Sequence, residues 1–418
     1  MSSKSRRVVI TGMGVVSPYG VGLDLFWDSV VQGKSGIKPV TLIDVSQQHA
    51  KIAGQINDFD ASLYLEKKEV KRMDRFSQLA MVAAKQAYED SGLDKDKVDP
   101  TRVGVIVGSA AGGIGTIESN HSTLLDRGPT KCSPFTVPMM ISNIAAGRIS
   151  IMLNAQGPNK CVVTACATAT HSMGDAFRTI AYGDADVMIA GGCEAPITPL
   201  SMAGFASART LSTRNDEPEK ASRPFDKGRD GFIMSEGAGI FVIESLDHAL
   251  ARGARIYAEF VGYGASGDAY DVVAPHPEGI GASRAMQLAL DDAELKPEEV
   301  QYINAHGTST SLGDIAETIA IKRTFGDYAK NGLLVSSTKS MIGHLLGAAG
   351  GVEAAVCVKT IETGIVTPTI NLVDQDEQCD LDYVANKSRK VDNINAVMSN
   401  SFGFGGHNAS LIFKKYTP

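Results

Sequence analysis

Short apolar runs alternate with longer alanine-rich segments along almost the whole chain. The runs have the length of strands and are rich in Val and Ile, whereas the segments between them have the length of helices. Strands that alternate with helices of about 10 to 15 residues are typical of an α/β fold with largely parallel sheets. The pattern predicts strands at residues 7–11, 103–107, 160–163, 187–190, 239–244, 258–263, 300–305, 333–336, 395–399 and 409–413.

A break near residue 255 divides the chain into two parts, each with the same alternation of short apolar runs and alanine-rich segments. Before it, a helix predicted over residues 246–252 ends at Gly253, because glycine commonly terminates helices. In each part a strand leads to an alanine-rich helix: one helix is predicted over 167–181, and the other over 345–361, closed by Gly364. We therefore expect two related α/β units, residues 1–255 and 256–418.

The composition is that of a globular protein with two or three domains. The 418 residues are 43% hydrophobic and 21% charged, and the formal net charge of −7 argues against nucleic acid as a partner. No stretch approaches the roughly 18 apolar residues of a membrane span, and the apolar run at residues 8–10 is too short for a signal peptide. We expect a cytoplasmic protein without membrane insertion, the alternative being an organelle lumen after loss of a transit peptide.

Two short glycine patterns resemble phosphate-binding motifs but are incomplete. Gly12 and Gly14 follow a predicted strand, yet Ser17 stands where the third glycine of a dinucleotide loop would be. Gly33, Lys34 and Ser35 resemble the end of a P-loop, yet Asp28 stands where its earlier glycine would be. The six cysteines include no C-x-x-C pair, which argues against a disulfide framework and a short-spaced zinc site. Neither a nucleotide cofactor nor a resident metal is therefore expected from these motifs.

Cys166 lies where a strand gives way to the helix predicted over 167–181. A thiol at the start of a helix is exposed to the positive end of the helix dipole, which favours the thiolate. Ala165, Ala167 and Ala169 leave its sulfur approachable. The alternative is a buried structural cysteine. We interpret Cys166 as a candidate nucleophile.

His306 follows the strand predicted over 300–305, at the edge of an α/β sheet where ligands usually bind. Thr308 and Thr310 place two hydroxyls on one side of the next turn, as donors to a carboxylate or carbonyl. Asp314 and Glu317 share one face of the following helix and are suited to orient a histidine or lysine, although acids are common in first helical turns.

His344 stands before the second alanine-rich helix, five residues after Lys339. A lysine near a buried imidazole keeps that ring neutral, so that its N–H can donate a hydrogen bond, whereas the alternative is a solvated loop charge. Glu353 lies in the apolar middle of the helix and must find a partner, since its burial alone is costly.

The glycine-rich segment 401–406 precedes the last predicted strand. Such a loop can move and can offer a backbone N–H to a ligand. Together with the N–H of Cys166, this donor would form an oxyanion hole, whereas the alternative is a tight turn.

Taken together, these residues resemble the β-ketoacyl-[acyl-carrier-protein] synthases of type II fatty acid synthesis, and specifically their elongating class. The resemblance spans essentially the whole chain and includes residues 8–14, 209–212, 222–226 and 400–408. It implies the thiolase fold, which has two duplicated α/β halves in a five-layer α-β-α-β-α arrangement, and a homodimer. Thiolases have Cys-His-Cys and the starter-unit synthases have Cys-His-Asn in place of the Cys-His-His set of this chain.

The resemblance also implies a role for each residue of the site. Cys166 accepts the acyl chain, and His306 and His344 hydrogen-bond the malonyl thioester and stabilise its enolate after decarboxylation. Lys339 supports the pair, and Glu353 organises the site. The N–H groups of Cys166 and Phe404 form the oxyanion hole, with Phe404 acting as a gate. The further substrate-binding residues implied are Thr308, Thr310, Ala111, Phe205 and Phe402.

The partner that the resemblance implies is an acidic acyl carrier protein, which brings phosphopantetheine with it, so that the enzyme itself needs no cofactor. Its implied docking residues are Lys67, Lys68, Lys71, Arg72 and Arg209, although a charge run is usually a solvated face. A structural monovalent cation is implied near Asn304, Glu353, Ser399 and Asn400.

The chain departs from the family pattern at two positions. Ala111 replaces a bulky Ile that separates the acyl pocket from its deeper end, so chain-length preference should be broader. His407 replaces a Thr and places a titratable group beside the Phe404 gate.

Other functions remain open on the sequence. A cysteine hydrolase would explain Cys166 and His306, but it leaves His344 and Lys339 unexplained. A polyketide-type ketosynthase or a non-catalytic partner resembling a chain-length factor would share the fold, although such partners usually replace the nucleophile. A zinc site formed by the Cys-His-His set is disfavoured by the long separations between the three residues.

Overall fold

The alternating strands and helices assemble around one mixed sheet in the computed structural model, which describes residues 6–418. Within these residues the sheet has 11 strands in the order β11-β10-β14-β15-β9-β1-β8-β7-β5-β6, with β2 paired to β1. The strands are β1 (Val8–Ser17), β2 (Gly20–Val21), β5 (Val103–Gly108), β6 (Asn159–Lys160), β7 (Val187–Glu194), β8 (Gly237–Ser245), β9 (Ala258–Gly267), β10 (Tyr302–Asn304), β11 (Leu334–Ser336), β14 (Ala396–Gly403) and β15 (His407–Lys414).

The two ends of the sheet repeat one strand order. The N-terminal half runs β6-β5-β7-β8-β1 and the C-terminal half β11-β10-β14-β15-β9, so that corresponding strands occupy corresponding places. In both halves the first two pairings are parallel and the last two are antiparallel. The halves join where residues 8–10 of β1 pair antiparallel with residues 258–260 of β9. This repeat is the structural sign of a duplicated unit.

The sheet is less parallel than the sequence pattern predicted. Its outer pairs are parallel, but every pairing from β14 across the middle to β7 is antiparallel. The prediction of largely parallel sheets is wrong because β14 and β15 are joined by the short turn at residues 404–406, and a hairpin allows only antiparallel pairing.

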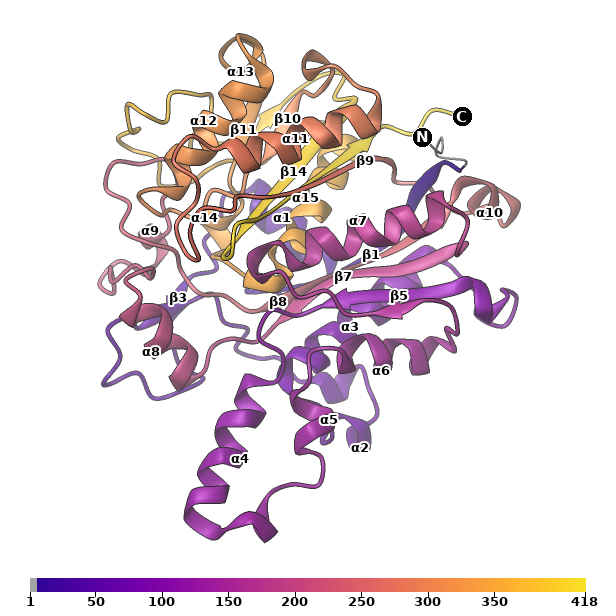
Figure 1. Cartoon of the computed structure of the whole chain (residues 1–418), viewed down its shortest axis with the longest axis vertical. Helices are drawn as coiled ribbons and strands as arrows, with labels where there is room; N and C mark the ends of the chain where they lie inside the picture. The colour runs from indigo at the N-terminus through magenta and orange to yellow at the C-terminus, as the bar shows by residue number, and fades with distance from the viewer. Residues whose placement is uncertain (1–5) are drawn as a thin grey trace.

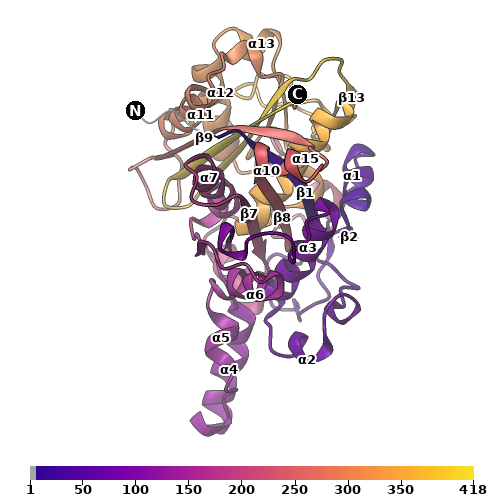
Figure 2. The same cartoon turned by 90° about the vertical axis from the view of Figure 1, so that its right-hand side faces the viewer.

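Helices cover both sheet halves and fill the space between them, giving five layers (Figures 1 and 2). The helices α3 (Arg75–Ser91) and α6 (Ile144–Leu153) form one outer layer, and α11 (Ile280–Ala293) and α12 (Gly313–Phe325) form the other. The middle layer consists of α7 (Thr168–Ala181) and α15 (Ala349–Thr363). Nearly every residue of α15 is buried, as expected of a helix that is packed on all sides.

The glycines of the incomplete dinucleotide pattern have a packing role. A Cβ on Gly12 or Gly14 of β1 would lie 2.2 or 2.0 Å from a carbonyl oxygen of α3. The corresponding glycines of β9, Gly262 and Gly264, would meet carbonyls of α11 at 2.4 and 2.0 Å. Each half therefore uses a Gly-x-Gly strand to bring an outer helix close to the sheet.

The remaining elements connect or extend these layers. Helices α4 (Ile114–Arg127) and α5 (Thr136–Met140) form an arm that projects from the N-terminal half (Figures 1 and 2). The others are α1 (Leu23–Val31), α2 (Lys67–Val70), α8 (Pro199–Ser207), α9 (Pro218–Ala221), α10 (Leu246–Ala251), α13 (Tyr328–Asn331), α14 (Lys339–Ile342), and the strand pairs β3 (Lys38–Pro39) with β4 (Ile52–Ala53) and β12 (Ile365–Val366) with β13 (Arg389–Lys390). None of the helices in residues 6–418 is long and apolar enough to cross a membrane.

Most predicted elements are present at nearly the predicted bounds. The helix α15 is closed by Gly364 as predicted, and this glycine has a left-handed φ of 68°. The strand predicted over 160–163 is wrong, because only Asn159–Lys160 pairs with β5 and the chain then turns toward Cys166. The division at residue 255 falls between α10 and β9 and stays a prediction.

Candidate active site

Cys166 lies on a tight turn that opens the central helix α7. A 3-10 turn, Ala165–Ala167, precedes the helix, and Ala165 adopts a left-handed φ of 50°. The second half repeats this turn before α15, where Leu346 has a φ of 47° and Gly347 takes the place of the cysteine. Since left-handed backbone is unfavourable for residues with a Cβ, the surrounding packing must hold the turn in place.

His306 begins the loop that follows β10, and its backbone is held by a buried carboxylate. Glu317 of α12 accepts hydrogen bonds from the N–H groups of His306 (2.8 Å) and Gly307 (2.7 Å). Asp314 accepts from Ser309 N–H at 3.1 Å, in the same loop. Both acids therefore act on the backbone of the loop, and Glu317 positions His306 through its main-chain N–H rather than through its ring.

His344 is held by its backbone, which forms an isolated bridge with the segment that precedes β8. Its N–H donates to the carbonyl of Ile233 at 2.7 Å, and its own carbonyl accepts from Ser235 N–H at 3.0 Å. Lys339, only 1% exposed, forms an ion pair with Glu353, which is fully buried in α15. Glu353 has thus found the partner that its burial requires.

The fold brings the three candidate reacting groups together. The sulfur of Cys166 and the nearest ring nitrogens of His306 and His344 all lie within 4.8 Å of one another. The two imidazole centroids are 5.3 Å apart, with the rings nearly perpendicular. Cys166 comes from the N-terminal half and precedes both histidines, which come from the C-terminal half, by more than a hundred positions, so the site is formed only when both halves pack together.

Burial keeps both imidazoles uncharged. The pKa of His306 and that of His344 are lowered well below the usual value, first because burial removes water and then because Lys339 adds a nearby positive charge. Within the described residues, Nδ1 of His306 and both ring nitrogens of His344 have no hydrogen-bond partner. Both rings are therefore available to hydrogen-bond a bound molecule. Lys339 lowers the pKa of both imidazoles, which is the direction that the sequence predicted.

The thiol of Cys166 is also neutral at rest. Burial raises its pKa to about 12, while Lys339 and a backbone hydrogen bond from Phe404 act in the opposite direction. The expectation of a resting thiolate is wrong, because the loss of water outweighs the helix dipole. A thiol facing two neutral imidazoles is the resting state of the site.

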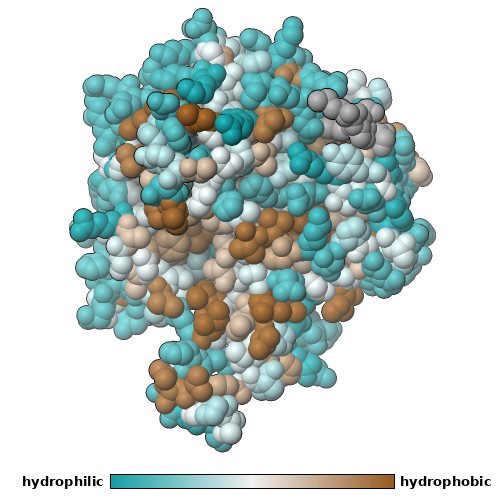
Figure 3. Space-filling view, viewed as in Figure 1, coloured by the Kyte–Doolittle hydropathy of each residue, from teal (hydrophilic) through white to brown (hydrophobic). Residues whose placement is uncertain are grey.

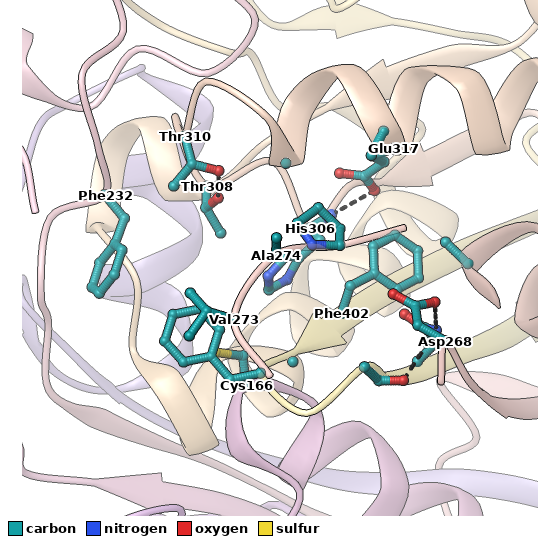
Figure 4. Close-up of a pocket in the computed structure, with 18 of the residues that line it drawn as sticks. Cys166, Phe232, Asp268, Val273, Ala274, His306, Thr308, Thr310, Glu317 and Phe402 are labelled. Atoms are coloured by element: carbon teal, nitrogen blue, oxygen red, sulfur yellow. Dashed lines mark hydrogen bonds between the residues drawn. The ribbon is translucent and has the colours of Figure 1, made fainter. Parts of the chain in front are cut away.

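One cavity contains all three groups. Figure 4 shows Cys166 and His306 facing the same space, with Thr308 and Thr310 beside them. The two hydroxyls are 3.0 Å apart, which places them on one side of the turn as predicted. Four phenylalanines also line the cavity, namely Phe205, Phe232, Phe402 and Phe404.

The segment that follows β14 closes against the Cys166 turn. Gly403 has no room for a side chain, since a Cβ there would lie 3.0 Å from the backbone nitrogen of Cys166. Phe404 follows, and its ring lies 6.3 Å from that of Phe205. Gly405 N–H donates to Val272 in a second loop, residues 268–277, which forms part of the cavity wall. Backbone N–H groups of Cys166 and Phe404 thus lie beside the same sulfur.

Sequence reasoning missed two residues of the site. Glu194, at the end of β7, is fully buried and accepts from Ser109 Oγ and three backbone N–H groups, those of Ala110, Ala111 and Gly347. Phe232 packs edge-on against His344 with centroids 5.2 Å apart. Glu194 could have been found in the sequence, because it is an acidic residue at the end of an otherwise apolar strand. No feature of the sequence distinguished Phe232 from the other phenylalanines.

Three unpartnered oxygens lie where a structural cation was expected. Asn304 Oδ1, Glu353 Oε2 and Ser399 Oγ are buried without a hydrogen-bond partner in the described residues, and Asn304 pairs with Ser399 across β10 and β14. Oxygen ligands of this kind fit a hard cation or a buried water. Asn400 does not belong to the set through its side chain, since its oxygen accepts from Ser410 at 2.8 Å.

The remaining predicted residues lie outside the cavity. Lys67, Lys68 and Lys71 are exposed on or beside α2, Arg72 is half-buried with its guanidinium 5.0 Å from the Phe135 ring, and Arg209 is exposed after α8.

Ala111 is exposed in the single chain and is not among the residues that line the cavity. The ring of His407 lies 6.4 Å from that of His171 in α7, whose pKa is lowered by burial and by His407.

Comparison with known proteins assigns the chain to a family. The family models for the β-ketoacyl synthase N-terminal and C-terminal domains match residues 5–249 and 257–373. The chain is 53% identical over 413 residues to a 3-oxoacyl-[acyl-carrier-protein] synthase 2 from Synechocystis sp., covering 99% of both chains. It is 54% identical over 414 residues to the enzyme of the same name from Staphylococcus aureus, again covering 99% of both.

Solved structures agree with this assignment. The ishigamide ketosynthase/chain length factor has a TM-score of 0.92 at 35% identity, with 99% of this chain and 100% of that chain covered. A type II PKS ketosynthase in complex with its acyl carrier protein has a TM-score of 0.90 at 34% identity, with 98% and 100% covered. The expected thiolase-like fold is thereby confirmed. With this strand order, this Cys-His-His site and these relatives, the chain belongs to the β-ketoacyl synthase family.

Proposed function

We propose that the chain elongates fatty acyl groups by a decarboxylative condensation with malonyl-[acyl-carrier-protein], giving 3-oxoacyl-[acyl-carrier-protein] and CO2. The observation that supports this most directly is the buried cavity in which one thiol faces two neutral imidazoles within 4.8 Å. The relatives at 53 and 54% identity are named for this activity.

The first half-reaction transfers the acyl chain to Cys166. Its sulfur attacks the carbonyl of the incoming thioester, the carbonyl oxygen becomes an oxyanion, and the N–H groups of Cys166 and Phe404 donate to it. The intermediate then expels the phosphopantetheine sulfur, which takes up the proton that Cys166 loses. One thioester replaces another, so no net charge or proton is gained.

The second half-reaction uses the two imidazoles as hydrogen-bond donors. His306 and His344 bind the malonyl thioester oxygen, and the malonyl carboxylate leaves as CO2 while its electron pair forms an enolate. Neutral donors placed where negative charge develops stabilise the transition state more than the ground state, by roughly 3–4 kcal/mol each. The enolate carbon attacks the acyl group on Cys166, which leaves as a thiolate and regains a proton from water. Loss of CO2 makes the new carbon–carbon bond effectively irreversible.

The partner that we infer is an acidic acyl carrier protein. It docks near α2 and Arg209, where four of the five basic residues named for it are exposed. One structural neighbour is a ketosynthase bound to such a carrier, which supports this inference. The phosphopantetheine arm then reaches Cys166 past Thr308 and Thr310, whose hydroxyls suit its amide carbonyls. The enzyme brings no cofactor of its own to the reaction.

We also infer a homodimer. Apolar side chains gather on the α4–α5 arm and on the face beside it (Figure 3), including Leu125 (71% exposed), Val137 (59%) and Ile151 (82%). Patches of this kind mark interaction surfaces. Ala111 lies at the base of the same arm, so a second copy could cover it and complete an acyl pocket around it.

A polyketide-type ketosynthase is the second candidate, because one solved structure compared above is a type II PKS ketosynthase and the other is a ketosynthase/chain length factor. The higher identity to fatty acid synthases favours elongation. A non-catalytic partner is disfavoured by the presence of Cys166.

Mass spectrometry of the protein after incubation with acyl-carrier thioesters of graded length tests the proposal. We expect an acyl adduct on Cys166, and none in Cys166→Ala. The variants His306→Ala and His344→Ala should still form the adduct but lose about 10²–10³-fold in condensation rate. An adduct on another residue, or condensation by Cys166→Ala, would contradict the mechanism.

A further inference from the structure

The Cys-His-His set has the composition and spacing of a metal-binding site as well as of a condensing site. Its three ligating atoms already lie within 4.8 Å of one another. Around a tetrahedral zinc ion, sulfur and nitrogen ligands are separated by about 3.3–3.6 Å. Small side-chain rotations would therefore bring all three to bonding distance. The long sequence separations, which argued against zinc, do not oppose it once the fold has brought the residues together.

The ring nitrogens are free to act as ligands. Nδ1 of His306 and both ring nitrogens of His344 are unpartnered within residues 6–418, and the two side chains are 9% and 2% exposed. A histidine binds a metal through one ring nitrogen and normally donates its other ring N–H to a neighbouring group or water. The unpartnered nitrogens leave one nitrogen of each ring open to a metal, and water would have to take the second N–H of His344. All three residues line one cavity, which leaves room for a fourth ligand.

We propose that Cys166, His306 and His344 bind a soft divalent cation, Zn2+, as three protein ligands, and that this binding reversibly blocks condensation. The thiol releases its proton to water as the sulfur–zinc bond forms, and water occupies the fourth position. Thiolate and imidazole ligands select zinc over magnesium or calcium, which prefer oxygen. Lys339 adds an opposing positive charge, which acts on all three ligands and is offset only in part by its ion pair with Glu353.

The consequence is mutual exclusion between metal and substrate. Zinc occupies the sulfur that an acyl chain needs and the nitrogens that the malonyl oxygen needs. An enzyme exposed to free zinc should therefore lose activity in proportion to occupancy and recover it when a chelator removes the ion.

Calorimetric titration of the metal-free, full-length protein with Zn2+ tests the proposal without any substrate. We expect one zinc per chain, no comparable binding of Mg2+, and at least about 10-fold weaker affinity in Cys166→Ala and in His344→Ala. Two matched variants should bind zinc as the unaltered protein does: Cys161→Ala, which removes another partly buried thiol, and His276→Ala, which removes another cavity histidine.

Titration with Cd2+ provides a readout that does not depend on affinity. A thiolate-to-cadmium charge-transfer band should appear in the ultraviolet spectrum of the unaltered protein and of Cys161→Ala, and be absent from Cys166→Ala. Equal zinc affinity in Cys166→Ala, or a cadmium band that survives in it, would overturn the proposal. Because neither titration uses a thioester, the result is independent of whether the condensation proposed above holds.

Discussion

Burial determines the protonation states of the reacting side chains at the residue scale. It lowers the pKa of both imidazoles and raises that of the thiol, so all three groups are neutral in the resting site. The N–H group of a neutral imidazole can donate a hydrogen bond to the oxygen of an enolate. It would thereby stabilise the negative charge that forms during decarboxylation. A neutral thiol, by contrast, must lose its proton during acyl transfer.

The thiol's pKa of about 12 predicts a specific pH dependence of its reactivity. Because only the thiolate attacks iodoacetamide, the rate of alkylation should rise about tenfold per pH unit between pH 6 and 9, without a plateau. Rates measured by intact-mass spectrometry, with Cys166→Ala subtracted, would check this. A plateau near pH 7 would mean that the helix dipole and Lys339 outweigh burial after all.

Ala111 predicts an altered preference for chain length. A bulky side chain at this position should close the deeper end of the acyl pocket, so Ala111→Ile should lower the turnover of long primers relative to short ones. Competition between two carrier-bound primers, followed by product mass spectrometry, measures the ratio directly. Ala110→Ile, one position away, is the control. An unchanged ratio would refute the role given to Ala111, which is exposed in the single chain.

At the scale of elements, buried carboxylates hold the loops of the site in place. Glu317 fixes the loop after β10 through the N–H groups of His306 and Gly307. Glu194 joins the loop after β5 to the turn before α15, because Ala111 and Gly347 both donate to it. The first acid acts within one half of the molecule, whereas the second connects the two halves.

Glu194 therefore predicts a coupled defect. In Glu194→Gln an amide N–H2 group would face N–H donors, which leaves buried donors unpaired at about 1–3 kcal/mol each. We expect a lower unfolding midpoint together with slower condensation and a changed primer preference. Chemical unfolding and the primer competition above measure these effects. If the variant were less stable but condensed at the normal rate and with the normal primer preference, the role of Glu194 would be structural only. Glu259→Gln, a half-buried acid that pairs with Arg7 far from the site, is the control.

The sequence allowed most elements to be predicted, together with the three candidate residues that the fold brings into one cavity, but few of their partners. Hydrophobic periodicity is local, so it located β1, α7 and α15. Antiparallel pairing in the centre of the sheet depends on how strands are connected, and the pattern does not contain that information. The partners of Glu317 and Glu194 are backbone amides, which every residue has; no side-chain pattern indicates them. The thiol's pKa depends on its burial, which only the packed molecule reveals.

At the scale of the whole molecule, duplication explains where the site lies. Each half contributes a tight turn at the start of a central helix, with Cys166 on one turn and Gly347 at the matching place on the other. The two central helices, α7 and α15, pack together between the two halves of the sheet, so the turns that precede them meet in the middle of the molecule. His306 and His344 come from the C-terminal half. Neither half alone contains a complete site.

The charge distribution of the whole molecule leads to a last prediction. With a net charge of −7 the enzyme as a whole repels an acidic carrier, so docking must depend on a local basic patch. The double change Lys67→Glu with Lys68→Glu should lower kcat/KM for malonyl-[acyl-carrier-protein] by about 10-fold at low salt, and the difference should shrink at high salt as screening increases. Activity with a small malonyl thioester should stay unchanged, because the cavity is untouched. Lys95→Glu with Lys387→Glu makes the same change of net charge on exposed lysines elsewhere and should leave the carrier reaction near normal. Equal losses in the two double variants would show that total charge, rather than the patch at α2, governs carrier binding.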